Sequence, residues 1–492
     1  MRICQFRRPW AADGSDMKAR ITGIKAGRDA QNSRPHQVMA LGFGAILLLA
    51  GCQPHSINPS PDPLQKGGVA YSVPSPTSTP VDQSWWLSFK DAKLNVLVDD
   101  ALNGNFDIMR GLARLDQADA LTRQAKAAPL PQVDLEANML RDWADDDTRN
   151  RSVWIGGALA WEVDVFNRLG SAALARESER AARVEDLQAI RLSLSAEVTD
   201  AYFDAVEQRR QLALLEQQIG LDRELLELTE LRFQAGLTAS VDVLQQSSQL
   251  AETESLVPPS EALLRVSENR LDVLIGQAPD ALDRVDDDDR FVAIGNLPFT
   301  GVPSDLLFNR PDLRALKNQL VAADAEIGQA IAERLPRILL DGSFFYGNGS
   351  DFTGPAGILL GSIVQPLLDW GARKAEVERS RALYVERLAV FSKAYLQAIE
   401  DVENALYQER KQREFLDRLE RRRRFLERTV EETRDRYTNG LTDFLPVLDA
   451  LKELQRIERI IVRQERALLG FRIQLHRALG GRVNANPNGD TL

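Results

Sequence analysis

The spacing of apolar and polar positions changes period several times along the chain. From Pro131 apolar residues alternate with polar ones, and the alternation resumes from Val153 after a polar stretch. A period of two is that of a β-strand. The two stretches predict paired strands of about ten residues, the length with which a tilted strand crosses a bilayer. A weaker alternation over 337–347 and 356–366 predicts a second pair.

Much longer stretches have the period of a helix. Apolar steps of three and four residues run without an internal proline through 168–235 and again through 372–438. Each would form a helix of roughly 100 Å at the usual rise per residue, and a helix of that length needs coiled-coil packing. Shorter helices are predicted over 241–278 and 442–479. The Pro-Pro pair at 258–259 should kink the first of these.

The chain contains this succession twice. Residues 107–135 and 312–340 align without a gap at eleven identical positions, and in both an Ala-rich helical run ends at Leu-Pro before a strand begins. A second pair, RFQAGLTASVDVLQ from Arg232 and RYTNGLTDFLPVLD from Arg436, is offset by nearly the same interval. A duplication of this kind predicts two similar halves in one elongated body rather than several compact domains.

The number of strands predicts an oligomer. Four strands cannot close a membrane barrel, because the smallest bacterial barrels have about eight. Open strand edges are not tolerated in lipid. Three copies of four strands would supply twelve.

The N-terminal region has the features of a targeting segment. A basic region precedes an apolar run at 38–50, which is too short to span a membrane as a mature helix. The run ends in Leu-Ala-Gly-Cys, similar to a bacterial lipoprotein signal in which Cys52 becomes the lipidated first residue. The alternative is an ordinary signal peptide followed by a chance cysteine. Residues 53–83, rich in Pro, Ser and Thr, predict an extended tether without packing.

Composition excludes several classes of function. The formal net charge is -11, so no basic domain is present for nucleic acid. The two cysteines, Cys4 and Cys52, cannot form a disulfide once the signal is removed. The three histidines are far apart in sequence, and no phosphate loop or metal motif occurs. We therefore expect no enzyme, no cofactor and no metal site. The acidic run Asp286 to Asp289 is interpreted as a solvated loop.

Taken in order, these features make the chain similar to the TolC-like outer membrane factors, specifically the NodT-type outer membrane efflux lipoproteins. The resemblance covers about 49–481. Its carriers, beyond the paired helix-Leu-Pro-strand units and the two Gly-Leu-Thr turns, are LAGC at 49–52, SWWLSFKDAKLNVLVDDAL at 84–102, WEVDVFNRLGS at 161–171, GVPSDLLFNRPDL at 301–313 and LLDWGARKAEVERSRA at 367–382. The second of these segments predicts a short amphipathic helix, with Trp85 and Trp86 as packing anchors.

The resemblance implies a mainly α fold with a membrane β-barrel part. It implies a homotrimer with a 12-stranded β-barrel in the outer membrane and an α-helical tunnel through the periplasm. The expected function is that of a passive exit duct for drugs or other small molecules, in a tripartite efflux pump. The implied partners are a periplasmic adaptor (membrane fusion) protein, an inner-membrane pump of the resistance–nodulation–division (RND) type, and outer-membrane lipid.

The expected organisation divides the chain into six parts. These are a lipoprotein-type signal peptide (1–51), the lipidated Cys and tether (52–83), a first repeat half (84–278), an equatorial linker (279–311), a second repeat half (312–480) and a C-terminal tail (481–492).

Two alternatives remain. A component of a type I secretion system would share the channel architecture. A periplasmic coiled-coil adaptor lipoprotein without a pore would not need paired strands of membrane-crossing length, so the strands argue against it.

Two carboxylates are candidates for a periplasmic gate. Asp449 and Asp242 follow the Gly-Leu-Thr turns, and in a trimer each would form a ring of three. By resemblance, Asp449 matches a gate aspartate that narrows the closed pore. The structural alternative is an acidic residue in the first turn of a helix, where the helix dipole favours it. Pro446 and Thr442 stand where some relatives have a second aspartate and a bridging arginine, so the closing network differs here.

The turns themselves are expected to reverse the chain and to dock the adaptor. Glycine supplies the permissive backbone for a sharp reversal. The turn residues are Gly236, Leu237 and Thr238 in the first half and Gly440, Leu441 and Thr442 in the second.

Overall fold

A computed structural model describes residues 54–66, 68, 70–72, 84–141, 151–280, 282–286, 290–298, 300–348 and 353–481. The predicted signal peptide and Cys52 lie outside these ranges. Within them, no helix combines the length and the apolar character that a membrane crossing requires.

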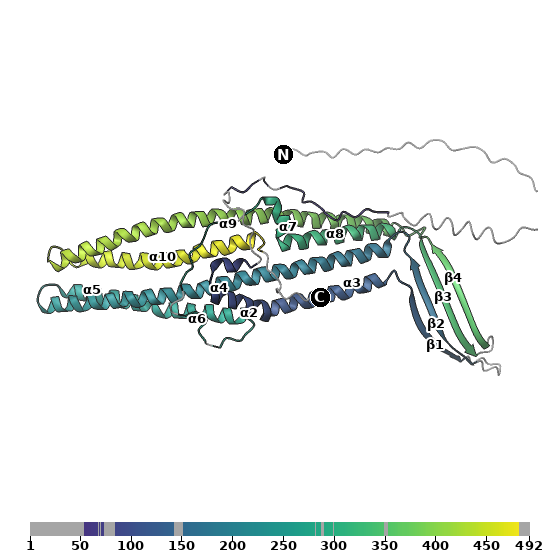
Figure 1. The fold of residues 1–492 in the computed structure, drawn as a ribbon, viewed down its shortest axis with the longest axis horizontal. Coiled ribbons are helices and arrows are strands. Elements are labelled where there is room, and N and C mark those ends of the chain that lie inside the picture. The colour runs from purple at the N-terminus through teal and green to yellow at the C-terminus, as the bar shows by residue number, and fades with distance from the viewer. Residues whose placement is uncertain are drawn as a thin grey trace, which may run out of the picture. The chain divides into compact units, whose positions relative to one another are not determined.

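The elements follow the predicted order in both halves (Figure 1). The first half consists of η1 (Trp85–Phe89), α2 (Ala92–Gly104), α3 (Phe106–Ala127), β1 (Gln132–Arg141), β2 (Arg151–Val163), α4 (Arg168–Gln234), α5 (Ser240–Ser255) and α6 (Val257–Leu274). A connection containing η2 (Pro303–Asp305) and α7 (Leu306–Asn309) follows. The second half consists of α8 (Pro311–Ala332), β3 (Arg337–Asn348), β4 (Thr353–Val364), α9 (Ala372–Thr438) and α10 (Leu445–Ala478).

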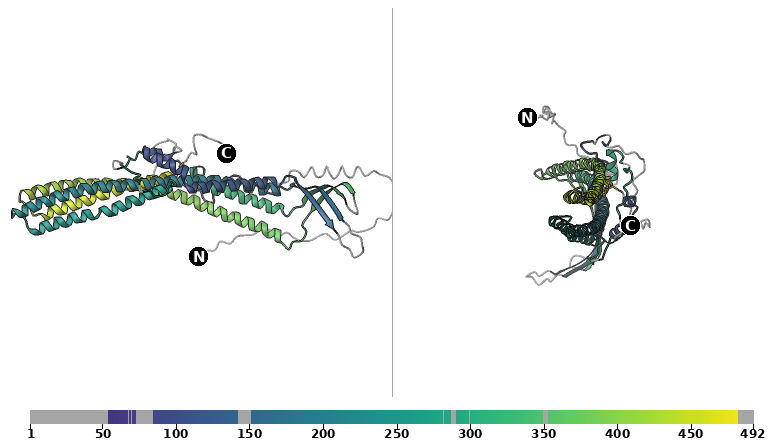
Figure 2. Two further views of the ribbon diagram at one scale, coloured as in Figure 1. Left: turned by 90° about the horizontal axis from the view of Figure 1, so that it is seen from below. Right: turned by 90° about the vertical axis from the view of Figure 1, so that its left-hand side faces the viewer.

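The two long helices are confirmed, and each is accompanied by shorter ones. α4 and α9 both have 67 residues. α4 packs against α3 and α8 over the part nearer the strands, and against α5, α6 and α10 further along. α9 packs against α8 and then α10. The strands lie at the opposite end of these helices from the Gly-Leu-Thr turns (Figure 2).

The helix that follows the Gly-Leu-Thr turn of the first half is interrupted at the proline pair, where the sequence predicted a kink. α5 ends at Ser255, and α6 begins two residues later. Pro258 and Pro259 lie in the first turn of α6, where the missing N–H groups would have no helical acceptor. The predicted helix 241–278 is therefore two helices.

The prediction of one helix over 84–102 was wrong. Trp85–Phe89 form a 3-10 turn, and Lys90 has a left-handed backbone (φ 55°) that ends it. The carboxylate of Asp91 then accepts the backbone N–H of Leu94 at 3.0 Å and begins α2. Asp91, a residue type that favours the N-cap, indicated that a helix begins inside this segment, but the continuous apolar periodicity suggested a single helix.

Trp85 and Trp86 are anchors, as predicted. Both are buried, and the Trp85 indole N–H donates to the Ser195 hydroxyl at 3.1 Å. The indole also stacks on His476 of α10, with ring centroids 5.3 Å apart. The 3-10 turn thus joins α4 of the first half to α10 of the second.

The strands form one antiparallel sheet in the order β1-β2-β3-β4. β2 and β3, which come from different halves, pair directly in the middle. β1 and β4 are the edges, and each pairs with only one strand of this chain. The duplication therefore meets at the centre of the sheet and leaves two edges.

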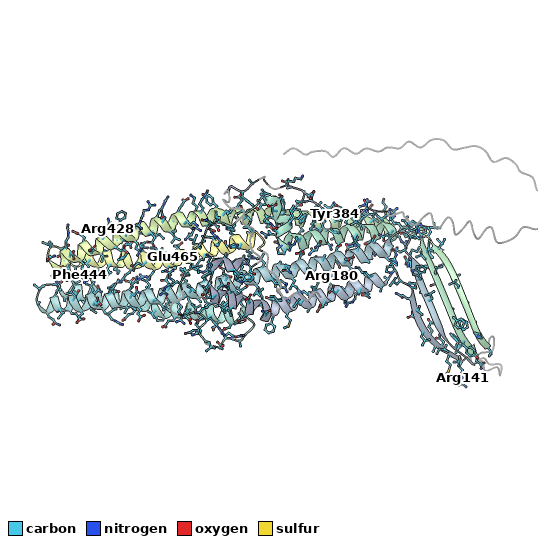
Figure 3. All side chains as sticks on the ribbon, in the orientation of Figure 1. Arg141, Arg180, Tyr384, Arg428, Phe444 and Glu465 are labelled. Atoms are coloured by element: carbon cyan, nitrogen blue, oxygen red, sulfur yellow. The ribbon has the colours of Figure 1, made fainter. Side chains whose placement is uncertain are left out.

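The register gives the sheet one mainly apolar face, and Arg141 lies at the far end of β1 (Figure 3). This face consists of Val133, Leu135, Ala137 and Met139; Val153, Ile155, Gly157, Leu159, Trp161 and Val163; Ile338, Leu340, Gly342, Phe344 and Tyr346; and Pro355, Gly357, Leu359, Gly361 and Ile363. Asp134, Glu136 and Asp341 lie on the other face. Many of the apolar side chains are exposed in the single chain, Leu135 by 79%.

Charged contacts fasten α10 to both long helices, α4 and α9, between the strands and the turns. Arg466 of α10 is mostly buried and donates to Asp200 and Asp204 of α4 at 2.9 and 2.8 Å. Burial raises the pKa of Asp200, although Arg466 acts in the opposite direction. The buried pair Arg472–Glu409 joins α10 to α9 through two hydrogen bonds of 2.9 and 2.7 Å.

The linker between the halves runs across these helices. The Arg472 guanidinium donates to the backbone carbonyls of Asn296 and Gly295 at 3.0 and 3.1 Å. Arg210 of α4 lies over the ring of Phe291 at 4.4 Å. Residues 290–298 therefore cross α4, α9 and α10 and are fastened to each half.

The described residues of the tether are extended but packed, so the prediction of an unpacked tether was wrong. His55 and the backbone N–H of Asn58 both contact the Asp324 carboxylate of α8 at 2.7 Å. The N–H of Leu64 donates to Ser392 of α9 at 2.9 Å. Tyr71 is 7% exposed and belongs to the core between α8 and α9. One buried tyrosine and fixed polar partners hold these residues in place, although their composition indicated no packing. We call residues 54–66, 68 and 70–72 the strap.

Candidate gate and docking site at the helical tips

Both Gly-Leu-Thr turns end their long helices in the same way. Gly236 and Gly440 have φ values of 74° and 73°, a conformation that favours glycine. The N–H of Leu237 donates to the Arg232 carbonyl, and that of Leu441 to the Arg436 carbonyl, each at 2.8 Å. These are Schellman caps, which use carbonyls that a helix end leaves unpaired. The structural role predicted for the glycines follows from this geometry.

The caps turn one leucine of each tip outward. Leu237 is 66% exposed and Leu441 is 77% exposed. Thr238 and Thr442, the next residues, are partly buried. An exposed leucine at each of two tips is an apolar feature that a partner protein can cover.

A contact between the two tips was not predicted from the sequence. The Arg232 guanidinium near the end of α4 lies 4.5 Å from the ring centre of Tyr437, near the end of α9. Arg232 also donates to the Thr438 carbonyl at 3.4 Å. Tyr437 packs in turn on the buried ring of Phe444, with ring centroids 5.5 Å apart. The sequence does contain an indication of this contact, because an arginine followed by an aromatic residue precedes both turns.

The two candidate gate carboxylates are not equivalent in the duplication. Counted from the turn glycine, Asp242 corresponds to Pro446, and Asp449 corresponds to Gln245. Asp242 is partly buried in the first turn of α5 and accepts hydrogen bonds from the Thr238 hydroxyl and, at 3.4 Å, from the Ala239 N–H. Its carboxylate thus serves the beginning of α5.

Asp449 has no such local role. It is the fifth residue of α10 and is exposed, while Val447, Leu448 and Ala450 around it are buried. Among the residues that the structure describes, no hydrogen bond or ion pair occupies its carboxylate. The structure therefore places a free carboxylate on the surface of α10 just above the tip.

A buried polar layer holds the two helical hairpins together above the tips. The fully buried carboxylate of Asp222 in α4 accepts Gln455 of α10 at 2.9 Å and Thr253 of α5 at 2.7 Å. Gln249 of α5 donates to Gln455 at 3.0 Å. A shift of one helix would leave several of these buried polar atoms unpaired, so the layer fixes the register of the helices. The tips below it are joined mainly through Arg232 and Tyr437.

Comparison with known proteins places this architecture. The outer membrane efflux protein family matches residues 97–277 and 302–481, which are the two halves of the duplication and most of the chain. The chain belongs to the outer membrane efflux protein family. The resemblance found in the sequence is thereby confirmed.

Individual members of the family agree over almost their full lengths. Nodulation protein T of Rhizobium leguminosarum bv. trifolii is 26% identical over 456 residues, covering 89% of this chain and 96% of its own. The pyoverdine export outer membrane protein OpmQ of Pseudomonas putida is 28% identical over 429 residues, covering 81% of this chain and 88% of its own. The solved structure of the outer-membrane channel OprN superposes with a TM-score of 0.78 at 30% identity, covering 86% of this chain and 98% of its own.

These findings confirm the predicted fold class, the outer-membrane location and the role in efflux. The protein is an outer-membrane efflux channel component with a TolC-like protomer. The lipidation of Cys52 lies outside the described residues. The roles of Asp449, Asp242 and the turn residues remain predictions.

Proposed function

We propose that three copies of this chain form one exit duct, with twelve strands in the outer membrane and a helical tunnel in the periplasm. The sheet carries the proposal. Its strands have 10 to 13 residues, one face is apolar as far as Arg141 at the far end of β1, and two edges have no partner in the chain. Backbone groups in lipid must be paired, and only closure against other copies pairs β1 and β4.

The duct serves a tripartite pump. An inner-membrane RND pump and a periplasmic adaptor deliver cargo, and the channel provides passive exit for small molecules. The relatives support this assignment, since their names describe pyoverdine export and the efflux of solvents and toluene. The exposed Leu237 and Leu441 are the apolar points on which the adaptor docks.

Asp449 narrows and charges the closed tip. Three exposed carboxylates brought close together repel one another and attract cations. Asp242 is the weaker candidate, because its carboxylate already accepts hydrogen bonds within its own turn.

Two measurements test the proposed trimer and its role in efflux. Light scattering of the purified protein in detergent should give three times the mass of one mature chain; a monomer would contradict the closed barrel. Deleting the gene should sensitise cells to small toxic compounds, and the chain supplied in trans should restore resistance. Restored secretion of a protein, without a change in resistance, would favour type I secretion instead.

Single-channel recording tests the gate. Asp449→Asn should weaken both the preference for cations and the block by multivalent cations, and Asp242→Asn should do so less. Asp286→Asn, in the linker, removes the same charge away from the tips. If Asp449→Asn matches the wild type in conductance, ion preference and cation block while the trimer stays intact, the gate lies elsewhere.

A further inference from the structure

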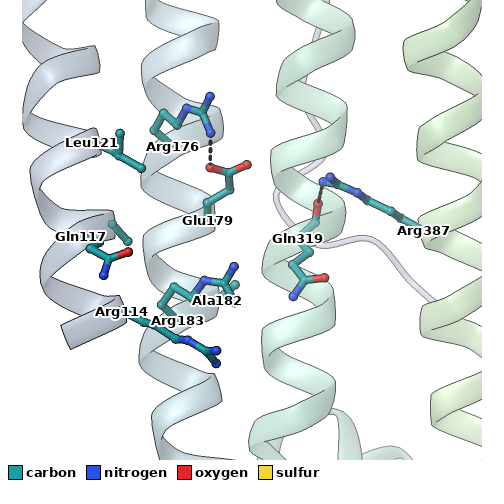
Figure 4. A pocket seen from close by; sticks show the side chains of 10 residues that line it. Arg114, Gln117, Leu121, Arg176, Glu179, Ala182, Arg183, Gln319 and Arg387 are labelled. Carbon is teal, nitrogen blue, oxygen red and sulfur yellow. Dashed lines mark hydrogen bonds and ion pairs between the residues drawn. The ribbon is translucent and has the colours of Figure 1, made fainter. Parts of the chain in front are cut away.

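A cleft of about 680 Å³ lies across the four helices nearer the strands (Figure 4). Arg114 of α3, Arg176 and Arg183 of α4, and Arg387 of α9 line it. The only carboxylate in the lining is that of Glu179. The remaining lining residues include the small Ala118 and Ala182 and the exposed Leu121.

Two of the four guanidinium groups have acidic partners. Arg176 pairs with Glu179 at 2.7 Å, and Arg183 pairs with Asp186 at 2.9 Å. Arg387 donates to the backbone carbonyl of Gln319 at 3.0 Å, a neutral acceptor (Figure 4). Within the described parts of the chain, no carboxylate lies at ion-pair distance from Arg114 or Arg387. The cleft therefore holds uncompensated positive charge, although the chain as a whole is acidic.

The cleft lies on the face of α8 and α9 that is turned away from the strap. The strap contacts Asp324 of α8 and Ser392 of α9. Gln319 and Arg387 each precede these residues by five positions, which is a rotation of about 140° around a helix. The sequence predicts lipidation of Cys52, just before the strap, and a segment that leads to a lipid anchor must run along the outside of a tunnel. The opposite face, with the cleft, then borders the lumen.

We propose that this cleft binds the anionic groups of solutes that pass through the duct. The inference rests on the proposed trimeric duct, in which each copy contributes one cleft. Guanidinium groups bind carboxylates and phosphates through paired hydrogen bonds, and the volume is that of a small-molecule site. Leu121 offers an apolar surface beside the charges, so organic anions are the class that the cleft fits.

The charge is local to this cleft. A neighbouring depression nearer the strands is lined by Glu326, Glu333 and Glu376, with Arg379 as its only basic residue. Permeability to small ions averages over both regions and is a poor measure of either. Block by a multivalent anion depends on one site and is the sharper measurement.

The probe is tripolyphosphate, added on the barrel side of trimers in planar bilayers. Wild-type channels should be blocked at a concentration that rises at least tenfold in the Arg114→Gln/Arg387→Gln variant. Arg387→Lys, which keeps the charge, should be blocked nearly as well as the wild type. Lys93→Gln/Lys411→Gln is the matched control: it also removes two positive charges, outside the cleft, where Lys93 pairs with Asp286 and Lys411 with Glu414. Unchanged block in the double variant would overturn the proposal.

Calorimetry on the same purified protein separates this inference from the proposed function. The wild type should bind up to three tripolyphosphate ions per trimer, and the double variant should bind at least tenfold more weakly. Binding without ionic conductance would contradict the duct and leave the cleft standing. Normal conductance without binding or block would contradict the cleft alone.

Discussion

Acid should destabilise this protein through one buried histidine. His476 of α10 is 3% exposed, between the rings of Trp85 and Phe89. Neither ring nitrogen has a hydrogen-bond partner among the described residues. Burial, and secondarily the neighbouring Arg472, lowers the pKa of His476 from 6.5 to about 3.

The direction of the pH dependence follows from how many protons the native and unfolded states bind. Below pH 6.5 the unfolded chain takes up a proton at this residue, and the native state does not until the pH approaches 3. The contribution of the neutral His476 to the free energy of unfolding is therefore fully present above pH 6.5 and is lost as the pH falls toward 3. These two pKa values give a loss of about 2 kcal/mol per chain at pH 5 and about 3 kcal/mol at pH 4.

His476→Phe isolates this contribution, because phenylalanine keeps an aromatic ring beside Trp85 and cannot bind a proton. Denaturant unfolding of the detergent-solubilised trimer, followed by helical circular dichroism at pH 8 and pH 5, should show the wild type losing about 2 kcal/mol more per chain than the variant. Comparing the two proteins cancels the titration of other groups, such as the partly buried Asp200, whose pKa is raised.

Parallel pH dependence of the two proteins would refute the reasoning, because a water-accessible His476 would titrate alike in both states. His55, which pairs with Asp324 at 2.7 Å, provides the control. When His55→Gln is added to both proteins, His476→Phe should still reduce the loss of unfolding free energy between pH 8 and pH 5. Its disappearance would mean that the effect belongs to the strap.

Three further changes have defined outcomes. Glu409→Leu leaves the buried Arg472 without its carboxylate and should cost about 3–5 kcal/mol in denaturant unfolding; adding Arg472→Met should recover most of this, and a neutral single variant would show that the pair is solvated. Tyr71→Ala removes a buried ring worth about 3 kcal/mol and should speed proteolysis of the strap while α8 and α9 stay protected; equal protection of wild-type and variant straps would contradict its anchoring role. Cys52→Ser should abolish acylation of the mature chain, measured by mass and lipid labelling; normal labelling would reject the lipoprotein assignment.

Much of the fold could be predicted because it depends on periodicity, which one sequence displays. Alternation set the strands, and uninterrupted helical steps set α4 and α9 to within about a residue. The Gly-Leu-Thr turns could be placed because a left-handed cap favours glycine. The strap could not be predicted, since its order depends on Tyr71, His55 and acceptors more than 260 residues away.

The candidate site was predictable in place but not in chemistry. Asp242 and Asp449 follow similar turns, six and nine residues after the turn glycine, but the sequence does not show what either carboxylate contacts. The structure does, because Thr238 occupies one carboxylate and nothing described occupies the other. The arginine cleft could not be predicted either, since its residues come from four helices and are spread from Arg114 to Arg387 along the chain.

The duplicated helices show how two similar halves acquire different roles. Asp119 and Asp324 are the same position in the repeat. Asp119 of α3 pairs with Arg180 of α4, its neighbour in the layer. Asp324 of α8 instead accepts His55 and Asn58 of the strap. The same carboxylate therefore joins two helices in one half and fastens the strap in the other. In the proposed duct with the predicted lipid anchor at Cys52, one such attachment per chain is enough, and a strap on the outer face of α8 and α9 leaves the lumen open.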